Sequence, residues 1–439
     1  MTISDDDINT VLTVLEQARD LDPYSPKYIL LEKAVAHLVK SGKKRRKKIR
    51  HQKTIVHDKA VKRSTGLADE RFGTSSTLLE SQRLRKCYVC SQSFNLSHHY
   101  YHTMCQSCGD ANWAARRQKA DLSGRRALVT GGRIKIGYAT ALSMLRMGAD
   151  VHVTSRFPTD AYQRYAAEDD FDTWAERLHL YGLDFRLLPD VMQQVEAWRE
   201  GEPFDILINN AAQTVWHPPE YYRALYAGEV KAKQLPLSST AIVHKYTPTQ
   251  QAALVLDDNH PLFPAGELDV QGNPLDLRRD NSWVQGLDEI APLEMVEVQL
   301  INSIVPFLLC SRLHPNMKRS PFADRYIVNV TATEGSFSKS LKLPRHPHTN
   351  MAKAALNMIT RTSAHSYAKD GIYMTSVDPG WMSHEGPAQV VEKAYSTGFH
   401  PPLAAEDSAA RILDPILRGV IQKVFVYGVQ LKDFAEVAW

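Results

Sequence analysis

Short strand-like runs and longer helical segments alternate in this chain from about residue 125 onward. The runs "RALVT", "DVHVTS" and "FDILINN" are nearly continuous in apolar and β-branched residues, and segments of helical periodicity separate them. Strands of this composition are typical of parallel sheets that are buried on both faces, because crossover helices cover them. The pattern predicts an α/β fold with a doubly wound parallel sheet over residues 122–439.

A glycine-bearing turn follows the first of these strands. In "ALVTGGRIKIGYAT" a strand leads into Gly131, and a helix opens near Ile136 and Gly137. Backbone N–H groups at such a turn, together with the helix N-terminus, can approach a pyrophosphate. The strand–turn–helix context therefore predicts a Rossmann-type dinucleotide site.

The charges around this turn favour NADP over NAD. The second strand ends at Arg156, about twenty residues after the turn, and no carboxylate stands there to take a ribose 2′-hydroxyl. A guanidinium at that place can pair with a 2′-phosphate. Arg133 and Lys135 add positive charge at the same mouth.

These motifs resemble those of the short-chain dehydrogenase/reductase family, over roughly residues 122–439. The turn 130–137 matches the family's T-G-x-x-x-G-x-G, although Lys135 replaces the middle glycine, as in the T-G-x-x-x-R-x-G turn of NADP-dependent pteridine reductases. The sequence 209–212, Asn-Asn-Ala-Ala, stands for the family's N-N-A-G. The resemblance implies cofactor contacts at Thr130, Gly131, Arg133, Lys135, Ile136, Gly137, Arg156, Asp184, Asn210, Ala211, Lys353, Pro379 and Gly380.

The catalytic centre departs from the family pattern. The family uses a serine, a tyrosine and a lysine four residues after the tyrosine, with a helical asparagine that holds a proton-relay water. Lys353 and Asn302 match the lysine and the asparagine, but Thr349 stands at the tyrosine position and Ala332 at the serine position. An aliphatic hydroxyl is far less acidic than a phenol, so Thr349 cannot simply take over the acid/base role.

A histidine beside the vacant position offers one substitute. His348 precedes Thr349, and an imidazole suits proton transfer near neutral pH. An ordinary polar loop residue is the simpler interpretation of this side chain. Lys353 keeps a role in binding the nicotinamide ribose under either interpretation.

Two hypotheses for the function follow, and a third rests on other parts of the chain. The first is an NADP-dependent oxidoreductase that acts on a small-molecule carbonyl or alcohol through an atypical proton donor. The second is a pseudoenzyme that keeps bound NADP as a sensor or scaffold. The third is a nucleic-acid or protein adaptor. By family analogy, the helix of Lys353 also forms a homo-oligomer interface.

Four of the five cysteines lie within 22 positions, in the form C-x2-C-x14-C-x2-C. Two such pairs of thiolates can complete a tetrahedral Zn²⁺ site, which stabilises a small segment. Three nearby histidines (His98, His99 and His102) can replace a thiolate, although a surface role is simpler. The spacing predicts structural rather than catalytic zinc at Cys87, Cys90, Cys105 and Cys108, in a module over 86–112.

The first 85 residues predict a helical and basic region. Two amphipathic helices are expected within 1–41, and a basic run follows in "KSGKKRRKKIRHQK". The run at 40–63 is either a solvated helix face or linker, or a binding site for nucleic acid, an acidic partner or an import receptor. We expect a cytoplasmic protein, or a nuclear one through the basic run.

The segment at about 217–290 is too long and too rich in proline and polar residues for an ordinary loop. We interpret it as an insertion that shapes the substrate pocket or binds a partner. No run of 18 apolar residues is present, so no membrane partner is expected.

Overall fold

The computed structural model describes residues 3–67, 80–232, 242–244, 260–264, 266–269, 272–339 and 342–439. The chain divides into two compact units. Unit 1 comprises residues 1–86 and 93–102, and unit 2 comprises residues 87–92 and 103–439. Both cysteine pairs belong to unit 2, so the thiols are part of the same compact unit as the predicted sheet.

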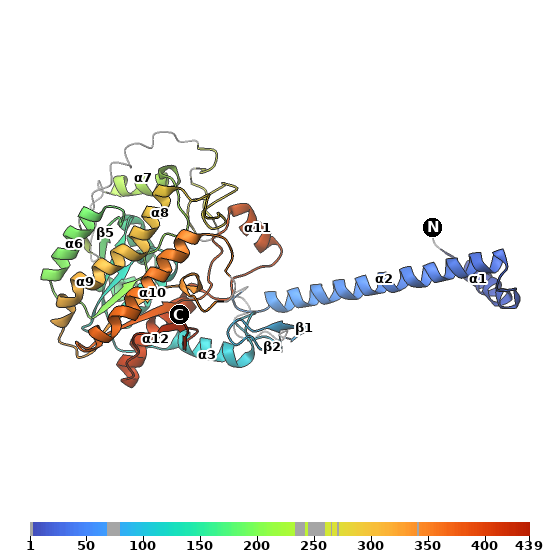
Figure 1. Ribbon diagram of the computed structural model, residues 1–439, viewed down its shortest axis with the longest axis horizontal. Helices are drawn as coiled ribbons and strands as arrows, with labels where there is room; N and C mark the ends of the chain where they lie inside the picture. The colour runs from blue at the N-terminus through green and yellow to red at the C-terminus, as the bar shows by residue number, and fades with distance from the viewer. Residues whose placement is uncertain are drawn as a thin grey trace. The chain divides into compact units, whose positions relative to one another are not determined.

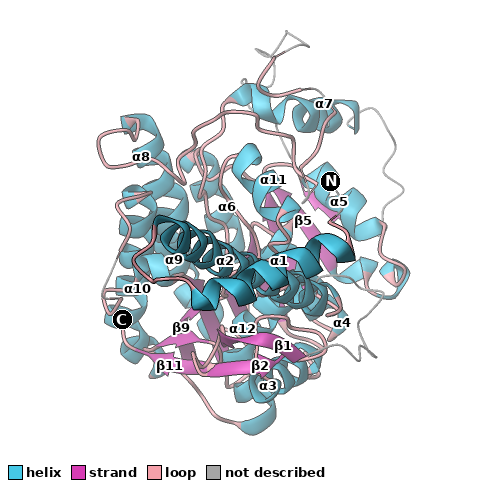
Figure 2. Cartoon of the chain, turned by 90° about the vertical axis from the view of Figure 1, so that its right-hand side faces the viewer, coloured by secondary structure: helices cyan, strands magenta, loops and turns pink. Residues whose placement is uncertain are grey.

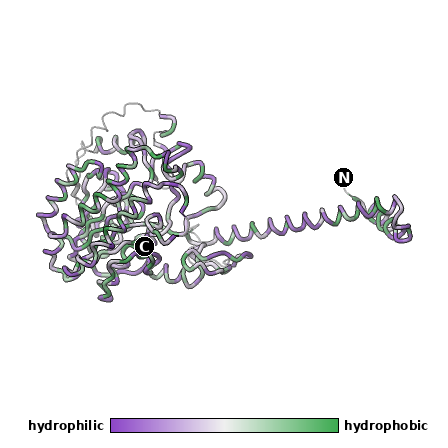
Figure 3. Tube along the Cα trace, viewed as in Figure 1, coloured by the Kyte–Doolittle hydropathy of each residue, from purple (hydrophilic) through white to green (hydrophobic). Residues whose placement is uncertain are grey.

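Unit 1 contains two helices and a hairpin. The helices are α1 (Asp5–Gln17), capped by Ser4, and α2 (Pro26–Arg63), capped by Ser25. The basic run predicted as a helix face or linker is part of α2, which extends without a break through it and buries only Val61. Its middle is hydrophilic (Figure 3). Strand β1 (Glu80–Lys86) pairs antiparallel with β2 (Ser93–Leu96).

Unit 2 is built on a sheet of nine strands within the described residues, in the order β11-β10-β9-β8-β6-β3-β4-β5-β7. Figure 2 labels β5, β9 and β11 of this sheet. All neighbours pair in parallel except β10 and β11. The predicted doubly wound α/β fold is confirmed. The strands are β3 (Arg126–Thr130), β4 (Asp150–Ser155), β5 (Leu178–Gly182), β6 (Ile206–Asn209), β7 (Ile242–His244), β8 (Arg325–Val330), β9 (Ile372–Asp378), β10 (Gln430–Lys432) and β11 (Ala435–Val437).

Helices cover both faces of this sheet, and a separate apolar cluster lies under each layer (Figure 1). One layer contains α4 (Lys135–Arg146), α5 (Pro158–Ala166) and α12 (Ala405–Leu417), with Leu145 and Ile412 in its core. The other contains α6 (Leu188–Glu200), α9 (Val305–Lys318) and α10 (Pro347–Ala368). Continuous apolar strands fit this two-sided burial.

The insertion is described in part, because residues 233–241, 245–259, 265, 270 and 271 lie outside the described ranges. Its described elements include α7 (Arg223–Ala232) and β7, which adds an edge strand beside β5. The short helix α11 (Ala388–Ser396) follows β9, and α3 (Gln106–Arg117) follows the second cysteine pair.

One helical stretch, Pro292–Lys318, is long and apolar enough to cross a membrane by composition. It comprises α8 (Pro292–Gln299), a π-helical turn (Leu300–Ile304) and α9. Half of its most apolar window is buried inside unit 2, where α9 packs against α6. Its apolar character is therefore explained by its place in the core.

Candidate nucleotide site and thiol cluster

A cavity of about 930 Å³ opens at the carboxyl ends of β3, β4 and β6. The strand order reverses on either side of β3, and open α/β sheets bind ligands at such a switch point. The walls combine sheet ends with later segments of the chain. They are formed mainly by residues 131–137, 154–157, 183–185, 210–217, 268–277 and 382–396.

Close packing at the predicted turn requires glycine. A Cβ at Gly137 would lie 2.2 Å from the carbonyl oxygen of Gly131, and Gly131 itself has φ +70°. The Asn210 side chain fixes the turn, because its Nδ2 donates to the carbonyls of Thr130 and Gly131. The Thr130 hydroxyl accepts from the backbone N–H groups of Asn210 and Ala211. The cradle is therefore formed by Thr130, Gly131, Gly137, Asn210 and Ala211.

Two of the predicted cationic residues of this mouth are already paired. Arg133 Nη1 lies 2.7 Å from Asp160, and Lys135 Nζ lies 2.8 Å from Glu385. Lys135 also has φ +53°, so it holds the left-handed backbone of the glycine that it replaces. Burial opposes the charge of Glu385, but Lys135 and Ser383 outweigh it and keep the pKa of this carboxyl low.

Arg156 differs, because one end of its guanidinium is left open. The group lies over the Tyr222 ring, 4.4 Å from its centroid, and Nη1 is buried without a hydrogen-bond partner among the described residues. Burial disfavours the charge, yet Tyr222 and Asp184 raise the pKa of Arg156. Asp184 also lines the cavity and forms a bidentate pair with Arg186. The wall therefore offers an ordered cation with spare donor capacity.

The insertion contributes a group of ionic and aromatic side chains to this wall, which the sequence did not reveal. His217 stacks on Tyr221 with ring centroids 3.8 Å apart. Its Nε2 lies 3.4 Å from Asp276, which Arg278 also binds. Burial lowers the pKa of His217 and outweighs the opposing influence of Asp276. The prediction that the insertion shapes the pocket agrees with this lining.

Asn302 lies in the π-helical turn Leu300–Ile304, where it ties the helix to the chain after β6. Its Oδ1 accepts from the N–H of Gln213, and its Nδ2 donates to the carbonyl of the same residue. The side chain is buried, and both of its polar atoms have partners. Asn302 therefore holds Gln213 at the cavity wall in this structure.

Lys353 is buried on α10 behind the cavity. Its Nζ donates to the carbonyl of Val330 at the end of β8, at 2.7 Å. Burial lowers the pKa of Lys353 to about 8, with a small opposing influence from Glu334 and Asp378. The amine is therefore positioned at the carboxyl edge of the sheet but turned to a backbone acceptor.

The other positions predicted for catalysis are also buried. His348 is 3% exposed and Thr349 is 4% exposed, and the Thr349 hydroxyl has no hydrogen-bond partner among the described residues. His348 Nε2 lies 3.3 Å from Glu294 on α8. Neither residue is among those that line the described cavity, and neither are Lys353, Asn302 and Ala332.

The end of the insertion covers the start of α10 and explains this burial. Trp283 stacks on His346 with ring centroids 4.3 Å apart and an interplanar angle of 12°. The N–H of His346 donates to the carbonyl of Gln285 at 2.8 Å. The insertion is thus packed against the residue that precedes α10, three positions before Thr349.

Pro379 and Gly380 follow β9, behind the loop that lines the cavity. Gly380 has φ +79°, and a Cβ there would lie 2.4 Å from Leu403. The residues that follow, from Met382 to Gly386, line the cavity. Ser383 Oγ donates to Glu385 at 2.5 Å, which connects this loop to Lys135 of the glycine turn.

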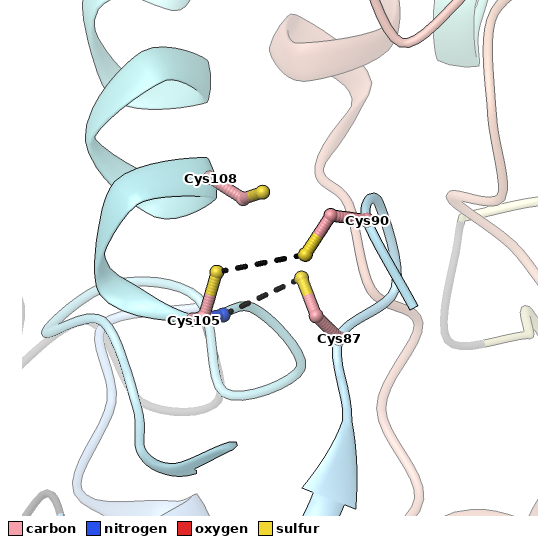
Figure 4. A group of neighbouring side chains, drawn as sticks. All are labelled: Cys87, Cys90, Cys105 and Cys108. Atoms are coloured by element: carbon pink, nitrogen blue, oxygen red, sulfur yellow. Dashed lines mark hydrogen bonds between the residues drawn. The ribbon is translucent and has the colours of Figure 1, made fainter. Parts of the chain in front are cut away.

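The four cysteines come together as the spacing predicts (Figure 4). Their sulfur atoms all lie within 4.8 Å of one another, and Cys90 and Cys105 are 3.9 Å apart. Zn–S bonds of about 2.3 Å in a tetrahedron separate the sulfurs by about 3.8 Å, so the set fits zinc. Burial raises the pKa of Cys105, but hydrogen bonds from Ser107 and from the backbone of Cys108 lower it to about 7.

The three histidines between the cysteine pairs belong to unit 1. His98 Nδ1 accepts from the N–H groups of Tyr100 and Tyr101. The described thiol group is composed of cysteines alone, so the four-thiolate assignment needs no histidine. A closed four-thiolate site leaves no open coordination position, as expected for a structural metal.

Comparison with known proteins finds a relative that covers most of the chain. No family model matches. The uncharacterized protein R665 of Acanthamoeba polyphaga mimivirus is 30% identical over 385 residues, which cover 82% of this chain and 76% of that protein. A short chain dehydrogenase/reductase of Colletotrichum higginsianum is 36% identical over 109 residues, or 24% of this chain and 26% of that protein.

Among solved structures, a short-chain dehydrogenase/reductase from Burkholderia multivorans with bound NADP aligns over 72% of this chain and 99% of its own. The TM-score is 0.45 and the identity is 17%. At this level the likeness carries no weight for cofactor or substrate.

Proposed function

We propose that this chain is an NADP-binding oxidoreductase of the short-chain dehydrogenase/reductase family. It is related over most of its length to R665, and over 109 residues to a member of that family. Its sheet topology and its glycine turn support the proposal. The carbonyl or alcohol substrate is a small molecule that reaches the cavity. Structural zinc belongs to the same proposal, held by Cys87, Cys90, Cys105 and Cys108.

The observation that carries the proposal is the open guanidinium of Arg156. A buried cation without a full set of acceptors is costly unless a ligand supplies them. The other two cations of the mouth, Arg133 and Lys135, already have carboxylate partners. A ribose 2′-phosphate provides the oxygen atoms that Arg156 lacks, whereas a 2′-hydroxyl provides a weaker partner.

The remaining residues of the cavity suit the other parts of a dinucleotide. The backbone at 131–137 and the start of α4 suit the pyrophosphate, because their N–H groups and the helix dipole favour negative charge. We assign the nicotinamide end to the side of Lys353 and the Pro379-Gly380 turn, which lie behind the residues that line the cavity. The nicotinamide supplies hydride chemistry when it is bound, and the chain must orient it and exclude water.

Titration with NADPH and NADH tests this proposal. We expect wild-type protein to bind NADPH at least about tenfold more tightly than NADH, since a charge-assisted hydrogen bond contributes roughly 1.5–3 kcal/mol. Arg156→Gln should remove this preference and leave NADH affinity unchanged. Arg146→Gln is the matched control, because Arg146 pairs with Glu168 and Asp170 and does not line the cavity.

An unchanged preference in Arg156→Gln would contradict the assignment of the 2′-phosphate site. Absence of binding by either nucleotide would overturn the dinucleotide function itself.

A second candidate, a dinucleotide-binding protein without turnover, is favoured by a specific observation. The positions of the proton donor and of the polarising serine carry Thr349 and Ala332, and Thr349 is buried and does not line the cavity. Under this alternative, bound NADP stabilises the fold or reports its own concentration to a partner. The basic run at 40–63 is a separate proposal for a contact with nucleic acid or an acidic protein.

A panel of carbonyl compounds, followed by nicotinamide absorbance, separates the two candidates. Turnover that is lost in His348→Gln supports an enzyme with an atypical donor. Tight NADPH binding without turnover, unchanged by that substitution, supports the second candidate.

A further inference from the structure

We call residues 379–386, which follow β9, the cofactor loop. The side chain of Tyr88, which lies between Cys87 and Cys90 in the sequence, connects the thiol cluster to this loop. Its hydroxyl accepts a hydrogen bond from the backbone N–H of Trp381, at 2.9 Å. Trp381 immediately follows Pro379-Gly380, the turn at the end of β9. All of these residues belong to unit 2.

Hydrogen bonds among residues 87–105 hold the turn that carries Tyr88. The N–H of Tyr88 donates to the carbonyl of Thr103, and the N–H of Cys87 donates to the carbonyl of Gln92. Cys87 Sγ accepts from the N–H of Cys105, which brings the second cysteine pair against the first. The place of the Tyr88 ring therefore depends on the geometry of the four sulfurs.

Tyr88 also forms one wall of the Gly380 turn. A Cβ on Gly380 would lie 3.1 Å from the Tyr88 hydroxyl and 3.6 Å from Arg411 Nε. Arg411 is fully buried, and its Nη2 donates to Asn112 of α3 at 2.6 Å. Because Cys105 is the N-cap residue of α3, the second cysteine pair is also connected to this turn, through Asn112 and Arg411.

The contact continues from Trp381 to the cavity. Trp381 Nε1 donates to the carbonyl of Ser383 at 2.6 Å, and Ser383 Oγ donates to Glu385. Glu385 pairs with Lys135 of the glycine turn, and both Ser383 and Glu385 line the cavity. A displacement of Trp381 would therefore shift Ser383 and Glu385 at the wall of the proposed nucleotide site.

We infer that Tyr88 is a positioning residue through which metal binding at the four cysteines sets the shape of the cofactor loop and the affinity for dinucleotide. The inference rests on the proposed NADP site for its affinity arm. The metal does no chemistry here. It fixes the cysteine turn, and the Tyr88 hydroxyl holds the N–H of Trp381.

The experiment compares Tyr88→Phe with Tyr367→Phe in the zinc-loaded full chain. Tyr367 is the matched control, because its hydroxyl also bonds to a backbone carbonyl, that of Cys310, and the residue does not line the cavity. Three quantities are measured: zinc content, the Kd for NADPH, and hydrogen exchange of peptides that span 379–386.

We expect Tyr88→Phe to keep its zinc, to raise the Kd about two- to tenfold, and to speed exchange at the Trp381 amide, as the loss of one hydrogen bond predicts. Tyr367→Phe should leave all three quantities unchanged. Removing zinc with a chelator should weaken NADPH binding in wild-type protein. The effect should be smaller in Tyr88→Phe, because this variant already lacks the hydrogen bond to the Trp381 N–H.

Unchanged affinity and exchange in Tyr88→Phe would overturn the inference. So would an equal effect of zinc removal on wild type and variant, because the coupling would then bypass Tyr88. If wild-type protein binds no dinucleotide, the proposed function fails separately, and the exchange measurement alone decides whether Tyr88 positions the loop.

Discussion

The two ends of the nucleotide site are built in different ways. At the glycine turn, the cradle around Gly131 and Gly137 is enforced by backbone contacts that leave no room for a side chain. At the other end, Thr349 on α10 and Ala332 after β8 stand where the resemblance expects the proton donor and the polarising serine, and Trp283 stacks on His346 just before α10. The cradle that we propose for the dinucleotide is therefore separate from the positions proposed for proton transfer.

The largest expected effect comes from adding a methyl group to the cradle. In Gly137→Ala the new Cβ would lie 2.2 Å from the Gly131 oxygen and 2.4 Å from Asn210 Nδ2. Backbone atoms must shift to relieve this overlap, so we expect a loss of roughly 1–3 kcal/mol in the free energy of unfolding. NADPH binding should be lost. Urea denaturation and calorimetric titration measure the two effects.

Gly228→Ala is the matched control, because a Cβ on this glycine of α7 meets nothing within 4 Å. Alanine favours a helix over glycine, so stability should stay equal or rise by about 0.5–1 kcal/mol. Tight NADPH binding in Gly137→Ala would show that the cradle does not hold the dinucleotide.

The second prediction concerns the other end of the site and uses pH. Burial lowers the pKa of Lys353 to about 8, whereas an unfolded lysine titrates near 10.5. Between these values the unfolded chain binds more protons, so the contribution of Lys353 to stability rises with pH and is flat below about pH 8. Relative to Lys353→Met, wild-type protein should gain about 2–3 kcal/mol between pH 8 and 10.5.

Denaturation by urea at several pH values measures this difference, with Lys369→Met as the control on an exposed lysine next to the same helix. Parallel pH profiles for wild type and Lys353→Met would mean that Lys353 keeps an ordinary pKa. In that case the amine is not confined behind the cavity as the structure describes.

The sequence predicted those parts of the fold and site that local pattern determines. Apolar strands gave the doubly wound sheet, and C-x2-C spacing gave the thiol cluster, because both depend on neighbours along the chain. The cavity wall formed by His217 and Asp276 could not be predicted, since those residues are far apart in sequence and meet only through the insertion. The contact of Tyr88 with Trp381 joins residues 293 positions apart, and no local signal marks it.

The pairing of Arg133 and Lys135 shows the same limit. Both were predicted from the sequence as cations at the mouth of the site, and the structure adds a carboxylate to each of them. A carboxylate from a distant segment leaves no periodicity or spacing to detect. Of the three predicted cations, Arg156 alone keeps a buried N–H donor that no described residue uses. The proposed 2′-phosphate site therefore depends on this one side chain.

The smallest expected effect tests how strictly the cradle needs glycine where the chain has lysine. Lys135 has φ +53° and forms a half-exposed ion pair with Glu385. Lys135→Ala loses the pair and keeps the left-handed backbone, whereas Lys135→Gly also relieves the backbone. Since a left-handed residue with a Cβ costs roughly 1–2 kcal/mol, the glycine variant should be more stable than the alanine variant by about 1 kcal/mol. Relative to wild type, Lys135→Gly should be nearly neutral in stability, because such an ion pair contributes about 0–1 kcal/mol.

Urea denaturation measures the series, and the same pair of substitutions at Lys393, in the helix α11, should give the opposite order. An identical order at both positions would mean that residue 135 is not held in the left-handed conformation. The turn would then resemble the lysine- or arginine-bearing turns of the family in charge but not in backbone conformation.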